Sequence, residues 1–279
     1  MNIQFSKMHG LGNDFVVIDA IAQPINLSSE QIQFLADRHF GIGCDQLLLV
    51  ENTALANVDF RYRIFNSDGG EVEQCGNGAR CFARFVRVKG LTDKKVIRVE
   101  TQSGIIELHI DDKENVTVDM GVANFSPTSL PMKTDDLNIL NNDRYSLKLN
   151  SQLIEFGAVS MGNPHVVLLV DNVDKANVET LGPILEAHAI FPHRVNVGFM
   201  QIIDRKNLRL RVYERGVGET KACGSGACAA VVVAQQWGLV DKNVQVQLPG
   251  GTLTIQRTEN ANVLLIGDAV LVFDGQIKL

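Results

Sequence analysis

The sequence predicts an α+β fold with two pseudo-symmetric domains, each a curled mixed or antiparallel β-sheet wrapped around a central helix. Three observations predict it. The 279-residue chain carries one internal repeat at about half its length. Short runs alternate between apolar and polar residues, as strands do. One helix-like segment, residues 227–237, is apolar on nearly every side, which is typical of a buried helix.

The repeat has three landmarks that agree in order and spacing. Asn13 and Asn163 lie 150 positions apart in similar surroundings, GNDFVV and GNPHVV, and Cys75 and Cys223 lie 148 positions apart in CGNGA and CGSGA. A common separation over so much sequence indicates two similar halves related by a pseudo-twofold axis. The matched segments are residues 12–17 with 162–167, 60–65 with 208–213, and 75–79 with 223–227.

The first half begins with strands and one capped helix. Ser28 is placed as the N-cap of a helix that runs to about Arg38. Turn residues at 103–104 and 111–114 separate three further strands of a meander. The predicted strands are residues 16–19, 46–51, 60–65, 96–101, 105–110 and 115–120.

The second half repeats this plan after a polar segment. Residues 124–150 contain Pro127 and Pro131, and we expect them to form a linker and the irregular start of the second half. A helix is expected after each Cys-Gly-X-Gly motif. Arg80, Arg84 and Arg87 in the first of these helices are spaced as on a solvated helix face.

Composition and charge exclude several classes of protein. The formal net charge is −6 with no block of like charge, so neither a nucleic acid nor a membrane is expected as a partner. The N-terminus does not resemble a signal peptide, and no apolar run reaches the ~18 residues of a spanning helix. We therefore expect a cytoplasmic protein with reduced thiols.

The five cysteines are not arranged for a disulfide framework or for zinc. Their number is odd, and no two of them have the CxxC spacing of a zinc knuckle, so no metal is expected. Two of them, Cys75 and Cys223, stand directly before the glycine-rich helix starts. The other three, Cys44, Cys81 and Cys228, are expected to be structural.

A cysteine at the start of a helix has a defined chemistry. Unpaired N–H groups and the helix dipole stabilise an anion there, so both thiols are expected to have a lowered pKa. The same N–H groups can hold a carboxylate, which glycine allows to approach closely. Two such thiols on opposite faces of one carbon, Cys75 and Cys223, could remove and return a proton with inversion of configuration.

The motifs resemble those of the diaminopimelate epimerase family. Residues 66–81 (NSDGGEVEQCGNGARC) and 214–226 (ERGVGETKACGSG) are similar to its two signatures, and residues 9–15 and 162–165 match it as well. Ser225 stands where threonine is common and keeps the hydroxyl. The resemblance covers the whole chain. It also implies that the strand-like residues 269–273 return to the first domain, which gives domains of residues 1–120 with 266–279, and 121–265.

The resemblance implies a role for each matching residue. Cys75 and Cys223 would be the acid–base pair, with His165 and Glu214 tuning their protons. Arg215 would bind the distal carboxylate of the substrate, and Glu214 the ammonium beside the reacting carbon. The remaining residues implied in binding are Asn13, Gln46, Asn66, Gly76, Asn77, Asn163, Asn196, Gly224 and Ser225.

These implications make the chain an isomerase that needs no cofactor and acts on a small amino acid. The oligomeric state stays open, with a homodimer as the assembly considered. Taken singly, Asn13 and Asn66 could be turn residues, and His165 a core histidine.

Three other functions stay open. A proline or hydroxyproline racemase would use the same two thiols, but Arg215 and the asparagines favour a longer substrate with two charged ends. A hydrolase or transferase with one nucleophilic cysteine would need a histidine partner but not the second motif. Intact cysteines in both halves argue against a binding protein with a decayed site.

Overall fold

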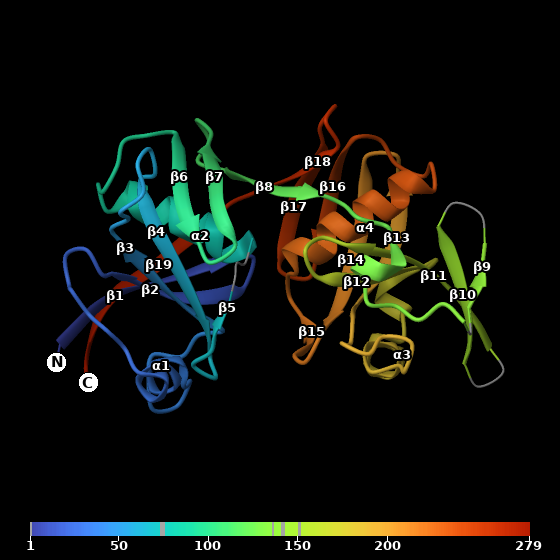
Figure 1. Ribbon diagram of the computed structural model, residues 1–279, viewed down its shortest axis with the longest axis horizontal. Coiled ribbons are helices and arrows are strands. Elements are labelled where there is room, and N and C mark those ends of the chain that lie inside the picture. Colours follow the sequence, from blue (N-terminus) through green and yellow to red (C-terminus); the bar gives the residue numbers. More distant parts are fainter. Residues whose placement is uncertain (1, 73–75, 136, 141–142, 150–151) are drawn as a thin grey trace. The chain divides into compact units, whose positions relative to one another are not determined.

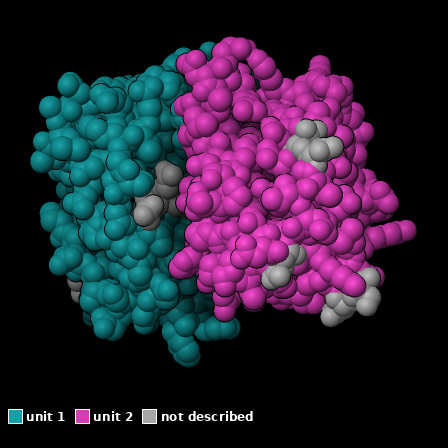
Figure 2. Space-filling model, turned by 45° about the vertical axis from the view of Figure 1, so that its right-hand side comes forward, with its two compact units in different colours: residues 1–119, 266–279 teal, residues 120–265 magenta. Residues whose placement is uncertain are grey.

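The computed structural model describes residues 2–72, 76–135, 137–140, 143–149 and 152–279. The chain forms two compact units, Met1–Asp119 with Ile266–Leu279, and Met120–Leu265. They are coloured teal and magenta in Figure 2. In each unit, strands surround one helix (Figure 1), so the α+β fold with a central helix in each half is confirmed.

In the first unit, helix α2 (Gly76–Val88) is the central helix. It contacts β1, β2, β3, β7 and β19, and the shorter helix α1 (Ser29–Ala36) packs on β3. The pairing β2–β3 is parallel, as is β4–β6, and the other registered pairs are antiparallel. The strands are β1 (Asn2–Gly10), β2 (Asn13–Asp19), β3 (Gln46–Glu51), β4 (Phe60–Asn66), β5 (Glu71–Val72), β6 (Val96–Thr101), β7 (Gly104–Ile110), β8 (Val116–Val122) and β19 (Val270–Lys278).

In the second unit, helix α4 (Gly224–Gln236) takes the central place. It contacts β11 to β14, β16 and β17, while α3 (Val178–Glu186) packs on β13, β14 and β15. Two 3-10 turns, Pro127–Ser129 and Val173–Lys175, complete the helical elements of the described residues. The strands are β9 (Asn138–Ile139), β10 (Arg144–Leu149), β11 (Gln152–Ser160), β12 (Pro164–Leu169), β13 (Asn196–Asp204), β14 (Asn207–Glu214), β15 (Gly218–Thr220), β16 (Asn243–Leu248), β17 (Gly251–Arg257) and β18 (Asn262–Gly267).

Strand pairing repeats between the two units. The parallel pair β2–β3 sets Phe15 opposite Gln46, and the parallel pair β12–β13 sets His165 opposite Asn196, each 150 positions later. A two-pronged ion pair is also repeated, between β4 and β5 in the first unit and between β14 and β15 in the second. Arg63 binds both carboxylate oxygens of Glu71 (2.9 and 2.8 Å), and Arg211 binds those of Glu219 (2.6 and 2.8 Å). These pairs join the strands that lead into and out of each hairpin before the cysteine motifs.

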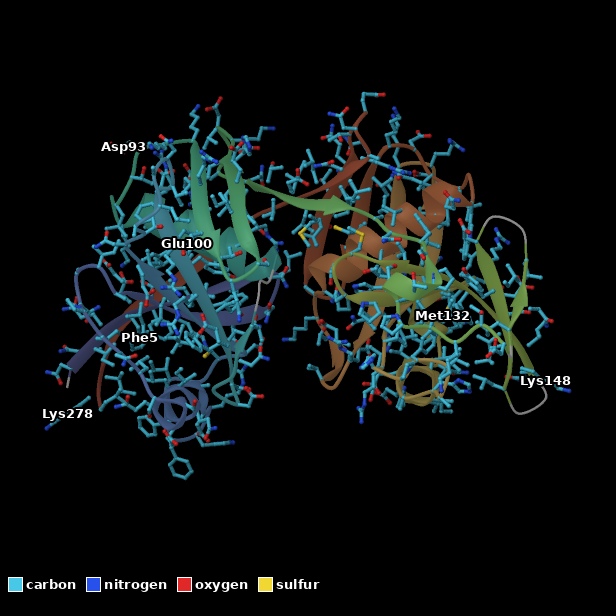
Figure 3. All side chains as sticks on the ribbon, in the orientation of Figure 1. Phe5, Asp93, Glu100, Met132, Lys148 and Lys278 are labelled. Atoms are coloured by element: carbon cyan, nitrogen blue, oxygen red, sulfur yellow. The ribbon has the colours of Figure 1, made fainter. Side chains whose placement is uncertain are left out.

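The strand at one side of each sheet has a different origin in the two units. Strand β19, from the end of the chain, pairs with β1, which confirms the predicted return of residues 269–273 to the first domain. Phe5 of β1, labelled in Figure 3, packs edge-on against Phe273 of β19, with ring centroids 6.0 Å apart.

In the second unit this place is taken by β10, beside β11. The prediction of an irregular segment over residues 124–150 is therefore wrong for residues 144–149. The unit needs a strand there, and the side chains of Tyr145 and Leu147 enter its core.

The helices differ from the prediction mainly at their ends. Helix α1 stops at Ala36, two residues before Arg38, because the Asp37 carboxylate accepts the N–H groups of His39 and Phe40 in a turn (2.7 Å each). Helix α4 begins at Gly224, directly after Cys223, and not at Ala227. The glycine-rich motif is thus the first turn of the helix.

The predicted arginine face of the first central helix is wrong for Arg80. Its side chain is fully buried, and its Nε–H donates to the carbonyl of Asp268 at 3.1 Å. Arg84 is half-buried and forms an ion pair with Glu114. A central helix is enclosed on most sides, so its arginine spacing does not define a solvated face.

Replacing Ser28 by alanine is expected to destabilise the first unit by about 1 kcal/mol. Ser28 and Gln31 form a capping box, in which each side chain accepts the other residue's N–H (3.3 and 3.0 Å). Asn177 at the start of α3 makes no such bond, so Asn177→Ala is the matched control and should cost less. Thermal unfolding of both variants measures the difference, and equal losses would contradict the role of the cap.

Candidate functional site

The predicted site residues of the first unit lie at the ends of β2, β3 and β4 and at the start of α2. Gln46 donates its amide to Asn66 Oδ1 at 2.8 Å, across the β3–β4 pair. Asn77 is buried in the first turn of α2 and donates to Asn13 Oδ1 at 3.1 Å. The structure therefore groups these four neutral side chains in two bonded pairs. Cys75, which precedes α2, lies outside the described residues.

An ion cluster behind Asn13 fixes its amide. The Nδ2–H of Asn13 donates to Asp45 Oδ2 at 2.8 Å, and Asp14 binds Lys7 and Arg38 at 2.6 and 2.7 Å. Burial opposes ionisation of Asp14, but hydrogen bonds from Arg38 and Lys7 outweigh it and hold the pKa of this carboxyl well below its usual range. The sequence did not single out Asp45, although it directly precedes Gln46.

Hydrogen bonds join the predicted residues of the second unit in two groups, one around Asn163 and one around Asn196. Asn163 donates to the Ser225 hydroxyl at 3.3 Å, and its Oδ1 lies 3.0 Å from His165 Nε2. Asn196 donates to the Pro164 carbonyl (3.0 Å) and accepts the N–H of Arg215 (2.9 Å). A carbonyl oxygen only accepts, so the bond to Asn163 assigns the proton of the neutral His165 to Nε2.

His165 is held neutral. It is buried at the start of β12, and burial, followed by the positive charge of Arg215, lowers its pKa to about 3. An imidazole with this pKa carries no charge near neutral pH. The histidine can orient Asn163 by its hydrogen bond, but it does not supply a cation to stabilise a thiolate.

Cys223 stands at the N-terminal end of α4. Its backbone is extended, its carbonyl accepts the N–H of Ala227 at 2.9 Å, and its sulfur lies 3.7 Å from Ser225 Oγ. The helical bonds thus begin at Ala227 and leave the N–H groups of Gly224, Ser225 and Gly226 for other acceptors. Gly226 uses its N–H toward the sulfur.

The pKa of the Cys223 thiol differs in direction from the prediction. Burial, followed by the charge and hydrogen bond of Glu214, raises its pKa well above the usual range, against smaller opposite effects of Gly226 and Ser225. The predicted lowering by the helix terminus is wrong for this residue. Cys223 is only 4% exposed, and a carboxylate next to its sulfur disfavours a second negative charge.

Glu214 is oriented by a residue that sequence analysis missed. The hydroxyl of Thr220, on the returning strand β15, donates to Glu214 Oε1. The repeat sets Asn66 at the position of Glu214, 148 residues earlier, and Val72 at that of Thr220. The second unit therefore has both the ionisable Glu214 and its hydrogen-bond partner Thr220. At the matching positions, the first unit has a neutral amide and an apolar residue.

Replacing Glu214 by glutamine is expected to lower the pKa of Cys223. The amide carries no negative charge beside the sulfur, so thiolate forms at lower pH. Alkylation of Cys223 by iodoacetamide, followed by mass spectrometry over a pH series, measures this. The profile of Glu214→Gln should move to lower pH, and that of Glu219→Gln, whose carboxylate binds Arg211, should stay. An unmoved profile for Glu214→Gln would refute the coupling.

Solved structures define the class of fold. A PhzF-family phenazine biosynthesis protein from Bacillus anthracis aligns with a TM-score of 0.69 at 17% identity over 100% of both chains. A hydroxyproline epimerase from Agrobacterium vitis aligns with a TM-score of 0.67 at 15% identity, over 99% of this chain and 92% of the other. At this identity the likeness shows that the chain has the fold shared by these proteins.

Sequence comparison then places the chain within that class. The family model "Diaminopimelate epimerase" matches residues 5–126 and 157–272. Proteins named diaminopimelate epimerase from Thioalkalivibrio sulfidiphilus and Ectopseudomonas mendocina are 57% and 54% identical to it, over 100% of each chain. The chain belongs to the diaminopimelate epimerase family.

Proposed function

We propose that this protein epimerises LL-diaminopimelate to meso-diaminopimelate by proton transfer at one α carbon, a step of lysine and peptidoglycan precursor biosynthesis. The identity of 57% to a diaminopimelate epimerase over the full length of both chains carries the proposal. The difference in identity favours this substrate over proline or hydroxyproline, because the hydroxyproline epimerase is only 15% identical to the chain.

The proposed chemistry uses two thiols. A thiolate of Cys75 removes the α proton on one face, and the electron pair is delocalised into the adjacent carboxylate. The S–H of Cys223 then gives its proton to the opposite face, so the carbon is inverted and Cys223 is left as thiolate. The raised pKa of Cys223 supports its role as the protonated partner at the start of this direction.

Helix termini and side chains would hold the substrate. The N–H groups at the start of α4, with those of Gly76 and Asn77 in the first unit, suit the carboxylate at the reacting carbon. Glu214 suits the adjacent ammonium, and Arg215 the distal carboxylate through a two-pronged contact. The asparagines and Gln46 supply neutral hydrogen bonds to the rest of the substrate.

The proposed proton transfers use side chains alone and need no cofactor. Two reactive thiols require a reducing compartment, so a cytoplasmic location belongs to the proposal. No helix in the described part of the chain combines the length and hydropathy needed to cross a membrane. A homodimer is also proposed, and light scattering of the purified protein decides it.

Deuterium uptake in heavy water tests the function. Purified protein incubated with LL-diaminopimelate should exchange the α proton for deuterium and form the meso isomer, which NMR and chiral chromatography detect. Proline and hydroxyproline serve as comparison substrates. Exchange with proline but not with diaminopimelate would reject the proposal in favour of a racemase of cyclic amino acids.

A further inference from the structure

Three hydrogen bonds tie the turn that carries Arg215, between β14 and β15, to neighbouring segments of the chain. The backbone N–H of Arg215 donates to Asn196 Oδ1 at 2.9 Å, and its guanidinium donates to the carbonyl of His193 at 3.3 Å. The next N–H, that of Gly216, donates to Glu186 Oε1 at 2.9 Å. Gly216 has a φ of +73°, a conformation that suits glycine. The position of Arg215 is therefore defined from both sides of its backbone and at its tip.

Glu186 is the last residue of α3 and its carboxylate is buried, with only 4% of the residue exposed. A buried carboxylate is costly unless charges and hydrogen bonds satisfy it. Here Arg194 donates to both oxygens (3.2 and 3.4 Å), and Gly216 supplies the backbone donor. Because Arg194 balances the charge of Glu186, the charge of Arg215 is left for another anion.

Glu186 also shapes the loop that holds the tip of Arg215. Its backbone carbonyl accepts the N–H of Val195 at 3.2 Å, and its side chain binds Arg194. Arg194 has a φ of +59°, which is a strained conformation for a residue with a side chain. This strained residue directly follows His193, whose carbonyl accepts from the guanidinium of Arg215. The side chain of Glu186 thus binds Gly216, which follows Arg215, and Arg194, which follows His193.

The repeat shows that this arrangement is particular to the second unit. Ala36, the last residue of α1, lies 150 positions before Glu186, and Ser67 lies 148 before Arg215. In the first unit the matching turn is held by the amide of Gln33, which donates to the carbonyl of Asp68 at 2.6 Å. In both units a side chain of a helix binds this turn. The buried carboxylate, Glu186, occurs in the unit whose turn carries an arginine, Arg215.

We propose that Glu186 is a positioning residue that fixes Arg215 for a substrate with a second carboxylate. This inference rests on the proposed function, in which Arg215 binds the distal carboxylate. Glu186 itself does not touch the substrate. It sets the backbone from which the guanidinium extends, and so it determines affinity for the distal end of the substrate and not the proton transfer.

A double-mutant cycle tests this on the purified protein. Glu186→Leu should raise the KM for LL-diaminopimelate by about 10- to 100-fold, the loss of a hydrogen bond to a charged group, while kcat changes less than about threefold. In an Arg215→Met background the same change should add less than about a twofold effect. Glu186→Gln keeps an oxygen for the Gly216 N–H and should stay close to wild type.

Controls separate the possible failures. Glu179→Gln, an exposed glutamate on the same helix, should leave both constants unchanged. If Glu186→Leu does not fold, as judged by circular dichroism, Glu186→Asp replaces it in the cycle, since it keeps the charge and withdraws the oxygens from Gly216. Additive effects of the two changes, or a lost kcat with an unchanged KM, would overturn the positioning role. Absence of exchange in the wild-type protein would instead reject the proposed function.

Discussion

Cys223→Ala is expected to abolish epimerisation. The variant has no proton donor on one face of the substrate carbon, and loss of a positioned acid or base costs about 10²–10⁴-fold in rate. The described residues near the sulfur give no substitute. His165 is neutral and bonded to Asn163, and the Glu214 carboxylate accepts a hydrogen bond from the Thr220 hydroxyl. Chiral chromatography of the product after long incubation measures the residual rate. Cys75→Ala should have the same effect.

Cys228→Ala is the matched control for this loss. It lies inside α4, the helix that Cys223 precedes, five positions after Cys223, and it is fully buried among apolar residues. Truncation there leaves a cavity of similar size, so it should lower the free energy of unfolding but leave the rate per folded molecule near that of wild type. If Cys223→Ala is folded and retains near wild-type epimerisation, the two-thiol mechanism is wrong for this protein. A hydrolase with one nucleophile would show one silent cysteine of the two.

The repeat allowed much of the fold to be predicted, because short strands and glycine-rich helix starts recur at a constant distance. Strands β3 and β6 have the predicted bounds, and β6, β7 and β8 pair as the predicted meander. Strand β10 was missed because its counterpart in the first unit, β19, lies at the other end of the sequence. An internal repeat matches segments in sequence order. It therefore cannot show that equivalent strand positions of the two units are occupied by β19, from the end of the chain, and by β10, from its middle.

Burial limited the prediction of charges. The helix start singled out Cys223 in the sequence, but the sign of its pKa shift depends on the burial of the residue and on Glu214, which is nine positions away in sequence. Arg80 was misplaced for the same reason, since helical spacing does not reveal that a helix is enclosed on most sides. Glu186 had no signal at all. It is one glutamate at a helix end, and its role depends on the turn at Gly216.

The serine variants should separate proton exchange from inversion. A serine hydroxyl can donate a proton but is a poor base near neutral pH, so epimerisation should fall strongly in both Cys75→Ser and Cys223→Ser. It should fall equally in both directions, because the equilibrium between the isomers is independent of the enzyme. Exchange of the α proton needs only one base. Each variant should therefore still incorporate deuterium with retention of configuration, from the isomer whose α proton faces its remaining cysteine.

The two variants should thus prefer opposite isomers. NMR of LL- and meso-diaminopimelate in heavy water, with chiral analysis of the labelled product, measures exchange and inversion separately. The raised pKa of Cys223 adds a second expectation. Exchange by Cys75→Ser depends on a thiolate of Cys223, so its rate should increase as the pH rises toward the raised pKa of Cys223. Exchange of the same isomer in both variants would mean that one base serves both faces, and the assignment of one thiol to each face would have to be abandoned.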